Sequence, residues 1–344
     1  MALDTLLEHI ESDINISDLL LSEGGPIVIR KTGDIVISEN TIDSTQMDQI
    51  IQDICGQNHI TRNTSIELDL GYSSKGGYYY RINLFLKSGA RSLAIRKITS
   101  KVMQLEDIMT GSLAQTIRNK VLGKKSGLFL VTGTAGSGKS TTLTTFLEYI
   151  NSNFTKHVLT IEDPIEFVYQ NDKSLFSQRQ VGKDTASFAS GLKSLLRQNP
   201  DVILVGEIRD PESAEAVINI AETGHLVLST LHTKAGINTI SRLVSFFPPH
   251  YQDSIKDRLA DVYLGSLAQQ LVKIPSTIKI TDVNRQIIGN SFGRIATYEL
   301  LLNNTAMANT IRKGDFKQIP SLIQTSRLDG MTSMEDYSKT IGLV

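Results

Sequence analysis

The stretch from Gly133 to Ser140 reads GTAGSGKS, with four residues between its first glycine and the Gly-Lys-Ser triplet. Glycines at this spacing permit a tight backbone path that points successive N–H groups at phosphate oxygens, and a following helix adds its positive N-terminal end. Lys139 can then reach the β- and γ-phosphates of a nucleotide, and the Ser140 hydroxyl can bind Mg²⁺. The residues that we expect to contact the nucleotide are Thr134, Ala135, Gly136, Ser137, Gly138, Lys139, Ser140 and Thr141.

Phosphoryl transfer also needs a carboxylate near the metal ion. The segment NPDVILVGEIRD has an acid at each end of an apolar run, Asp201 before it and Glu207 after it. At about 3.3 Å per strand residue, these two acids lie roughly 20 Å apart. Because phosphates bind at the carboxyl ends of parallel strands, we expect Glu207 to hold Mg²⁺ through a water molecule. Asp201 is expected to have a structural role at the entrance of the strand.

A third acidic cluster follows another apolar run in LTIEDPIEFVY, where Glu162, Asp163 and Glu166 lie within five positions. Hydrolysis requires a carboxylate that orients or deprotonates the attacking water. The cluster is therefore expected to serve Mg²⁺ or this water. The spacing leaves open which of the three acids faces the water.

Two histidines, His225 and His232, flank the apolar run of AETGHLVLSTLHT. Each lies at one end of a short predicted strand, so we expect both to make polar contacts. A strand of this length holds its two ends too far apart for one metal ion, which excludes joint metal ligation.

The elements that must position these residues follow from the hydrophobic pattern. Short apolar runs at 128–131, 158–161, 202–205 and 226–229 alternate with segments of helix length, which predicts a parallel sheet wrapped by helices. Residues 1–98 instead predict a small α+β domain, with an amphipathic helix from Leu3 to Ile10, a second helix near 45–55 and two β-hairpins. A polar linker is expected at 99–109, and the second domain at 110–344 ends in a helical segment.

Composition narrows the function further. The 344 residues carry 35 Lys and Arg against 36 Asp and Glu, so no overall positive field gathers nucleic acid, and a nucleic-acid translocase is disfavoured. No apolar run approaches the roughly 20 residues that span a bilayer. The acidic N-terminus is unlike a secretory signal, and we expect a cytoplasmic protein. The single cysteine, Cys55, excludes an internal disulfide and is expected to be buried.

The motifs TGTAGSGKSTT, TIEDPIEF, RQNPDVILVGEIRD and AETGHLVLSTLHT occur in this order. Together they resemble the Walker A, Asp box, Walker B and His box of the secretion and pilus ATPase superfamily, and within it the PilT-like retraction ATPases of type IV pili. The resemblance extends to SDLLLSEGGPIVIRKTGDI near the start and QIPSLIQTSRLDGMTSMEDY near the end.

This resemblance implies an N-terminal PAS-like domain joined to a RecA-like ATPase domain, and a ring of six subunits that bind ATP and Mg²⁺ between neighbours. It assigns the general base to Glu166 and the Walker B acid to Glu207. His225 and His232 match the His box, which couples nucleotide state to domain position.

The resemblance also assigns Arg81 in YYYRINLF and Arg96 in LAIRK to the arginines that reach the phosphates when the N-terminal domain closes. A mobile guanidinium stabilises negative charge that develops on the γ-phosphate, so the charge of both residues agrees with this role.

The implied work is pilus retraction. The implied partners are other copies of the chain in a homohexamer, an inner-membrane platform protein that holds the ring at the cytoplasmic face of that membrane, and other pilus ATPases, with no nucleic acid. One cysteine cannot build the four-cysteine zinc site of extension-type relatives, which favours retraction. The AIRNLIR motif of retraction ATPases reads AMANTIR here, with Ala308 and Thr310 as replacements. A pilus assembly or type II/type IVB secretion ATPase therefore remains an alternative, as does a weakly hydrolysing regulatory ring.

Overall fold

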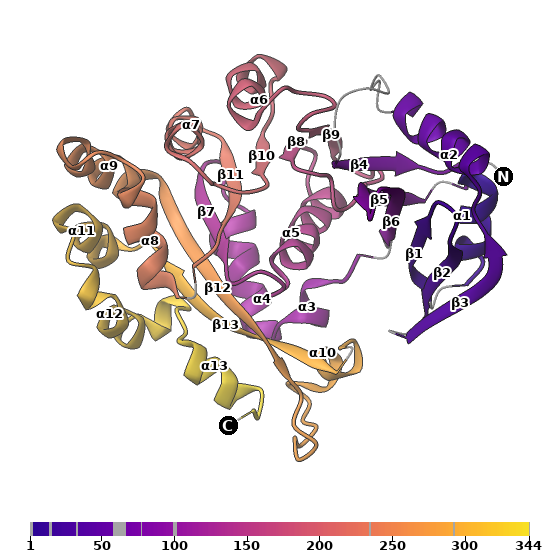
Figure 1. Ribbon diagram of the computed structural model, residues 1–344. Coiled ribbons are helices and arrows are strands. Elements are labelled where there is room, and N and C mark those ends of the chain that lie inside the picture. Colours follow the sequence, from indigo (N-terminus) through magenta and orange to yellow (C-terminus); the bar gives the residue numbers. More distant parts are fainter. Residues whose placement is uncertain are drawn as a thin grey trace. The chain divides into compact units, whose positions relative to one another are not determined.

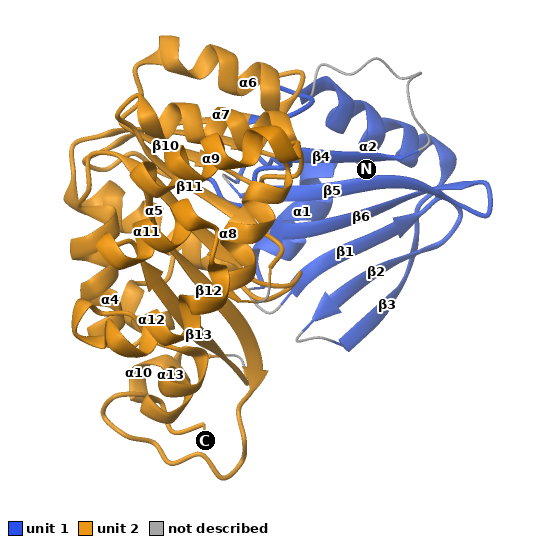
Figure 2. Cartoon of the chain, turned by 90° about the vertical axis from the view of Figure 1, so that its left-hand side faces the viewer, with its two compact units in different colours: residues 1–101, 163–168, 180–184 blue, residues 102–162, 169–179, 185–344 orange. Residues whose placement is uncertain are grey.

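In the computed structural model, the described residues are 3–13, 16–31, 34–57, 67–76, 78–98, 102–233, 235–291 and 293–343. They divide into two compact units (Figure 2). Unit 1 lies within residues 1–101, 163–168 and 180–184, and unit 2 within residues 102–162, 169–179 and 185–344.

Unit 1 is built on a six-stranded sheet in the order β3-β2-β1-β6-β5-β4 (Figure 1). Each neighbouring pair of these strands is antiparallel. The strands are β1 (Ile16–Ser22), β2 (Pro26–Lys31), β3 (Asp34–Thr41), β4 (Leu68–Ser73), β5 (Tyr79–Lys87) and β6 (Ala90–Ile98). The β2–β3 and β4–β5 pairs confirm the two predicted hairpins.

Two helices supply much of the core of unit 1, α1 (Leu3–Glu11) and α2 (Ser44–Gln57). Both confirm predicted helices. The buried side chains of α1 are Leu3, Leu6, Leu7 and Ile10, whose spacing places them on one helical face. Cys55 is buried on α2, as expected. Strand β1 was not expected from the pattern, because the three consecutive leucines of ISDLLLS hide its alternation.

Unit 2 contains a seven-stranded sheet in the order β13-β12-β7-β11-β10-β8-β9. Strands β8, β10, β11, β7 and β12 are parallel, and β13 is antiparallel to β12. The strands are β7 (Gly127–Thr132), β8 (His157–Glu162), β9 (Leu175–Gln180), β10 (Val202–Val205), β11 (Leu226–Leu231), β12 (Tyr263–Lys273) and β13 (Arg294–Leu302). The four predicted apolar runs form β7, β8, β10 and β11, and β7, β10 and β11 are buried along their whole length.

Helices surround this sheet. They are α3 (Leu105–Ile108), α4 (Gly111–Ile117), which continues as a π-helix (Arg118–Leu122), α5 (Lys139–Asn153), α6 (Phe188–Leu195), α7 (Pro211–Glu222), α8 (Gly236–Ser245), α9 (Pro249–Val262), α10 (Arg285–Gly289), α11 (Thr305–Lys313), α12 (Ile319–Thr325) and α13 (Met334–Thr340). Within the described part of the chain, no helix has the length and apolar character needed to cross a bilayer.

The expected linker at 99–109 is described only in part. Residues 99–101 lie outside the described residues, and α3 follows at once in unit 2 with Leu105 and Ile108 buried. The segments 163–168 and 180–184 group with unit 1 although they lie far along the chain. The limits 1–98, 99–109 and 110–344 stay predictions.

Candidate active site

The turn between β7 and α5 is a cradle of backbone. Gly136 and Gly138 have positive φ angles of 73° and 89°, which side-chain-bearing residues rarely adopt. A Cβ atom at Gly133 would overlap with the Ser137 hydroxyl and with the main-chain oxygen of Gln269. Both the conformation and the lack of space therefore require glycine in this turn, as expected for a loop that wraps around phosphate.

One buried polar atom of this loop lacks a partner. Ser137 is only 3% exposed, and its hydroxyl has no hydrogen-bond partner among the described residues. Leaving a buried polar group unpaired costs about 1–3 kcal/mol, so such a group in a native protein calls for an explanation. A bound phosphate group would supply the missing acceptor. Thr134, Ala135, Gly136, Ser140 and Thr141 are exposed along the same turn, so the loop fits a nucleotide.

Lys139 is the first residue of α5 and only 9% exposed. Its Nζ atom donates to the main-chain oxygens of Gly133, at 2.9 Å, and Thr134, at 3.1 Å. The same ammonium lies 3.5 Å from Nδ1 of His232. The lysine charge is thus held directly over the loop, where negatively charged phosphate oxygens would bind.

Glu207 follows β10, and its carboxylate is held from two sides. Oε2 accepts from Nε of Arg209 at 2.8 Å, and Oε1 lies 3.0 Å from Nε2 of His232. Because the Lys139 ammonium can only donate, the His232 Nδ1 atom accepts and Nε2 carries the proton toward Glu207. The His232 ring therefore bridges Lys139 and Glu207.

The two histidines lie at opposite ends of β11. In the parallel pairing of β11 with β7, Leu231 is opposite Thr132, directly before the glycine-rich turn, so His232 lies at that edge. His225 precedes the other end of the strand, roughly 20 Å away at about 3.3 Å per residue. Its Nδ1 atom contacts the Ile220 main-chain oxygen at 3.2 Å and the Thr223 hydroxyl at 3.0 Å.

The remaining acids differ in their burial and in their hydrogen-bond partners. Asp201 accepts from the His157 main-chain N–H at 2.9 Å, which confirms its structural role at the entrance of β10. Glu162 is buried at the end of β8 and accepts from the Thr160 hydroxyl at 2.6 Å. Asp163 and Glu166 are exposed on the segment that groups with unit 1.

Arg81 and Arg96 lie directly opposite each other on β5 and β6, and hence on one face of the unit 1 sheet. Like charges at such positions repel. Each is offset by an aspartate: Nε of Arg96 donates to Asp18 at 2.8 Å, and Nε of Arg81 lies 3.8 Å from Asp69. The Arg96 side chain is 67% exposed and that of Arg81 is 41% exposed, so both present guanidinium groups at the surface of unit 1.

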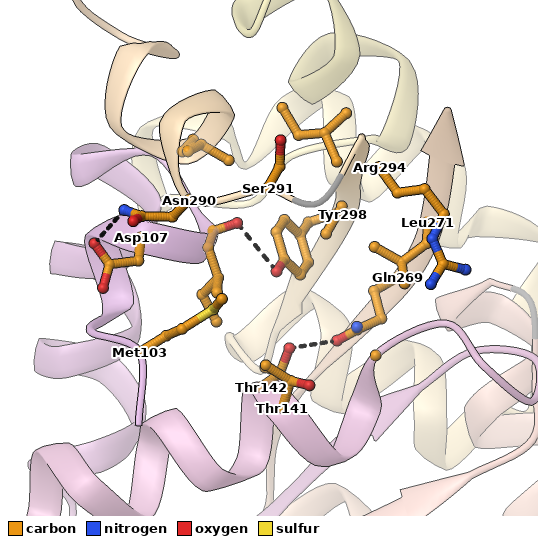
Figure 3. Close-up of a pocket in the computed structure, with 15 residues that line it drawn as sticks. Met103, Asp107, Thr141, Thr142, Gln269, Leu271, Asn290, Ser291, Arg294 and Tyr298 are labelled. Atoms are coloured by element: carbon orange, nitrogen blue, oxygen red, sulfur yellow. Dashed lines mark hydrogen bonds between the residues drawn. The ribbon is translucent and has the colours of Figure 1, made fainter. Parts of the chain in front are cut away.

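A cavity of about 160 Å³ lies beside the glycine-rich turn (Figure 3). The start of α5 contributes Thr141 and Thr142, and β12 contributes Gln269 and Leu271. Its further lining residues are Met103, Asp107, Ile108, Gly138, Ile287, Asn290, Ser291, Arg294, Ile295, Ala296 and Tyr298. The mixture of apolar and polar lining residues suits a partly polar ligand.

Three residues of this arrangement were not predicted from the sequence. Arg209 lies two positions after Glu207, inside the segment NPDVILVGEIRD. Asp18 and Gln269 gave no local signal, because each acts on a residue far away in the sequence. Gln269 is 1% exposed and is hydrogen-bonded to both the turn and α5.

Several known proteins are similar to this chain. Residues 55–339 match the family described as Type II/IV secretion system protein. The chain is 40% identical to the twitching motility protein of Neisseria gonorrhoeae over 80% of this chain and 69% of that one. It is 37% identical to the type IV pilus retraction ATPase PilT of Pseudomonas aeruginosa, over 93% of this chain and 88% of that one.

The structure is also similar to a crystal structure of the pilus retraction motor PilT with bound ADP. The TM-score is 0.82 at 31% sequence identity, over 99% of this chain and 97% of that one. This similarity confirms the predicted fold class, a small N-terminal α+β domain joined to a RecA-like ATPase domain.

Proposed function

The chain belongs to the Type II/IV secretion system protein family, and from this premise we propose that it is a Mg²⁺-dependent ATP hydrolase whose turnover drives retraction of a type IV pilus. The observation that best supports ATP hydrolase activity is the bridge from Lys139 through His232 to Glu207 at the carboxyl edge of the sheet. The names of the similar proteins, a twitching motility protein and a pilus retraction motor, support the pilus.

The turn binds the phosphates of ATP with its backbone N–H groups, the Ser137 hydroxyl and the Lys139 ammonium. Ser140, and Glu207 through a water molecule, would hold Mg²⁺, which would neutralise phosphate charge. The cavity beside Thr141 takes the base and the ribose, since it lies between the first turn of α5 and strand β12 and is lined by apolar side chains such as Leu271.

Five further residues take part in the reaction or in its coupling to domain motion. Glu166 orients and deprotonates the attacking water. Arg81 and Arg96 stabilise the charge of the γ-phosphate, which their exposed guanidinium groups allow. His232 touches both Lys139 and Glu207, so a change at the phosphates changes its hydrogen bonds. Together with His225, at the other end of β11, it couples nucleotide state to domain position.

The chain works as a homohexamer with nucleotides between neighbouring subunits. It is held at the cytoplasmic face of the inner membrane by a platform protein of the pilus, in concert with other pilus ATPases. The membrane contact is thus made only through partners, and nucleic acid has no part in the function.

Turnover by the purified chain tests the hydrolase. We expect Lys139→Ala and Glu166→Gln each to lower kcat by about 100-fold or more. ADP binding should survive in the Glu166→Gln variant, because this residue acts on water. Equal turnover in the wild type and both variants would contradict the proposed hydrolase.

Deletion of the gene tests the proposed role in pilus retraction. Loss of a retraction ATPase leaves pili that are present and unable to shorten, whereas loss of an assembly ATPase leaves no pili. The alternative function, a pilus assembly or secretion ATPase, is supported by helix α11. This helix carries Ala308 and Thr310 where retraction ATPases have arginine and leucine. Absence of pili after deletion would favour that alternative.

A further inference from the structure

We infer that Gln269 is a positioning residue of the nucleotide site, which fixes the orientation of one peptide group in the phosphate-binding turn. The inference rests on the proposed ATP hydrolase and adds a residue to it. Gln269 lies on β12, 132 positions after Ser137, and its side chain is buried between the turn and the first turn of α5.

Two hydrogen bonds define the role of this amide. Nε2 of Gln269 donates to the main-chain oxygen of Ser137 at 2.6 Å, and Oε1 accepts from the Thr142 hydroxyl at 2.8 Å. Figure 3 shows the Gln269 amide facing Thr142. A carbonyl oxygen can only accept, so the nitrogen of the amide has to face Ser137 and its oxygen has to face Thr142. The orientation of the amide is therefore determined by its partners.

The first bond controls the direction of a backbone N–H group. In a planar trans peptide, the C=O and the following N–H point in opposite directions. Holding the Ser137 oxygen toward Gln269 thus points the Gly138 N–H away from Gln269. The φ angle of Gly138, 89°, lies where a glycine turns with little resistance. Without the amide, the peptide could rotate and present its oxygen to the phosphates, which would repel them.

The position of Gln269 is set by the sheet. Strand β12 runs parallel to β7, with Ala268 opposite Thr132. The residue after Ala268 is Gln269, which therefore lies beside the start of the turn. Leu271 follows on the same face of β12 and lines the adjoining cavity. One strand therefore places an amide against the phosphate-binding turn and an apolar side chain against the base.

Substitution of Gln269 by leucine, which has a similar size, removes both hydrogen bonds. We expect ADP to bind the full-length Gln269→Leu variant about 10- to 100-fold more weakly than the wild type, as measured by calorimetric titration. Thr142→Val removes only the second bond and should give a smaller loss. Gln270→Leu is the matched control, since Gln270 is exposed on the opposite face of β12, and its ADP affinity should equal that of the wild type.

The Gln269→Glu variant gives a readout that a purely structural role would not produce. An ionised carboxylate can only accept, so it repels the Ser137 oxygen, whereas a protonated carboxyl has one donor and one acceptor like the amide. Burial raises the pKa of a carboxyl, which brings protonation toward neutral pH. We expect the ADP affinity of this variant, relative to the wild type, to rise at least about tenfold from pH 8 to pH 6. The relative affinity of Gln269→Leu should stay constant.

Two outcomes would overturn the assignment. One is ADP affinity of Gln269→Leu equal to that of the wild type. The other is a Gln269→Glu variant whose relative affinity does not change with pH. Failure of the wild type itself to bind ADP would instead contradict the proposed hydrolase, so the two failures are distinguishable.

Discussion

The Nε2 atom of His232 lies 3.0 Å from Oε1 of Glu207, while Nδ1 of the same ring lies 3.5 Å from the Lys139 ammonium. A residue that touches both the phosphate-binding lysine and the metal-side acid can transmit a change at either one. The ring needs both nitrogens for this, one to accept and one to donate.

We therefore predict that His232→Ala lowers kcat by about 10- to 100-fold while ADP affinity stays within about twofold of the wild type. The reason is that the lysine keeps its bonds to the turn, whereas Glu207 loses one of its two partners. Steady-state turnover and ADP titration check this. His250→Ala, an exposed histidine on α9, is the control that should turn over like the wild type. An ADP affinity that falls as far as kcat would contradict the prediction that His232 acts on turnover and not on nucleotide binding.

Glu207→Gln removes the negative charge that Arg209 and His232 hold in place. The amide cannot attract Mg²⁺ as the carboxylate does, so we predict a kcat about 100-fold lower, with a raised Mg²⁺ requirement. Nucleotide binding without Mg²⁺ should be unchanged or slightly tighter, because one negative charge near the phosphates is gone. Titration of turnover with MgCl₂, together with ADP binding in EDTA, checks both parts. An unchanged Mg²⁺ dependence would contradict the assignment of Glu207.

Much of the phosphate site could be predicted from the sequence because its parts follow strands that local apolar runs define. The run 202–205 alone predicts the edge of the sheet at which Glu207 lies, since parallel strands share their carboxyl edge. The order of the four motifs added the family, which the comparisons confirm.

Gln269 could not be predicted in this way. Its partner Ser137 is 132 positions away, and the contact depends on the pairing of β12 with β7 rather than on any local pattern. Asp18 is hidden for the same reason, since it meets Arg96 only through the pairing of β1 with β6. The acid among Glu162, Asp163 and Glu166 that faces the water was left open by spacing. Glu162 is buried and accepts from Thr160, whereas Asp163 and Glu166 are exposed, and the assignment of Glu166 stays a prediction.

Asp18 provides a test of the arginines on unit 1. It accepts from Arg96 at 2.8 Å and lies 3.7 Å from Arg30, and it is largely buried. Asp18→Asn should loosen Arg96 and leave the nucleotide-binding turn untouched, so we predict a kcat reduced by about three- to tenfold with little change in KM for ATP. Asp34→Asn, on the exposed strand β3, should behave like the wild type. A change in KM alone would argue that Arg96 acts on substrate binding rather than on the reaction.

Glu299 on β13 gives a prediction for stability and its dependence on pH. Burial is the main effect on this carboxyl and raises its pKa, while the bond from the Gly236 N–H, at 2.7 Å, lowers it in part. A raised pKa means that the folded state binds the proton more tightly than the unfolded chain does. The carboxyl therefore lowers the stability of the folded state as pH rises through its folded pKa. Below the unfolded pKa of about 4.5 it is protonated in both states and has no such effect.

The Glu299→Gln variant keeps an oxygen that can accept from Gly236 and has no charge to bury. We predict that it unfolds at a higher urea concentration than the wild type at pH 8, and that the difference shrinks as pH falls toward 4.5. Glu215→Gln, an exposed position on α7, should show no such convergence. A Glu299→Gln variant that is less stable than the wild type at pH 8 would mean that the charge of Glu299 strengthens its bond to α8 by more than its burial costs.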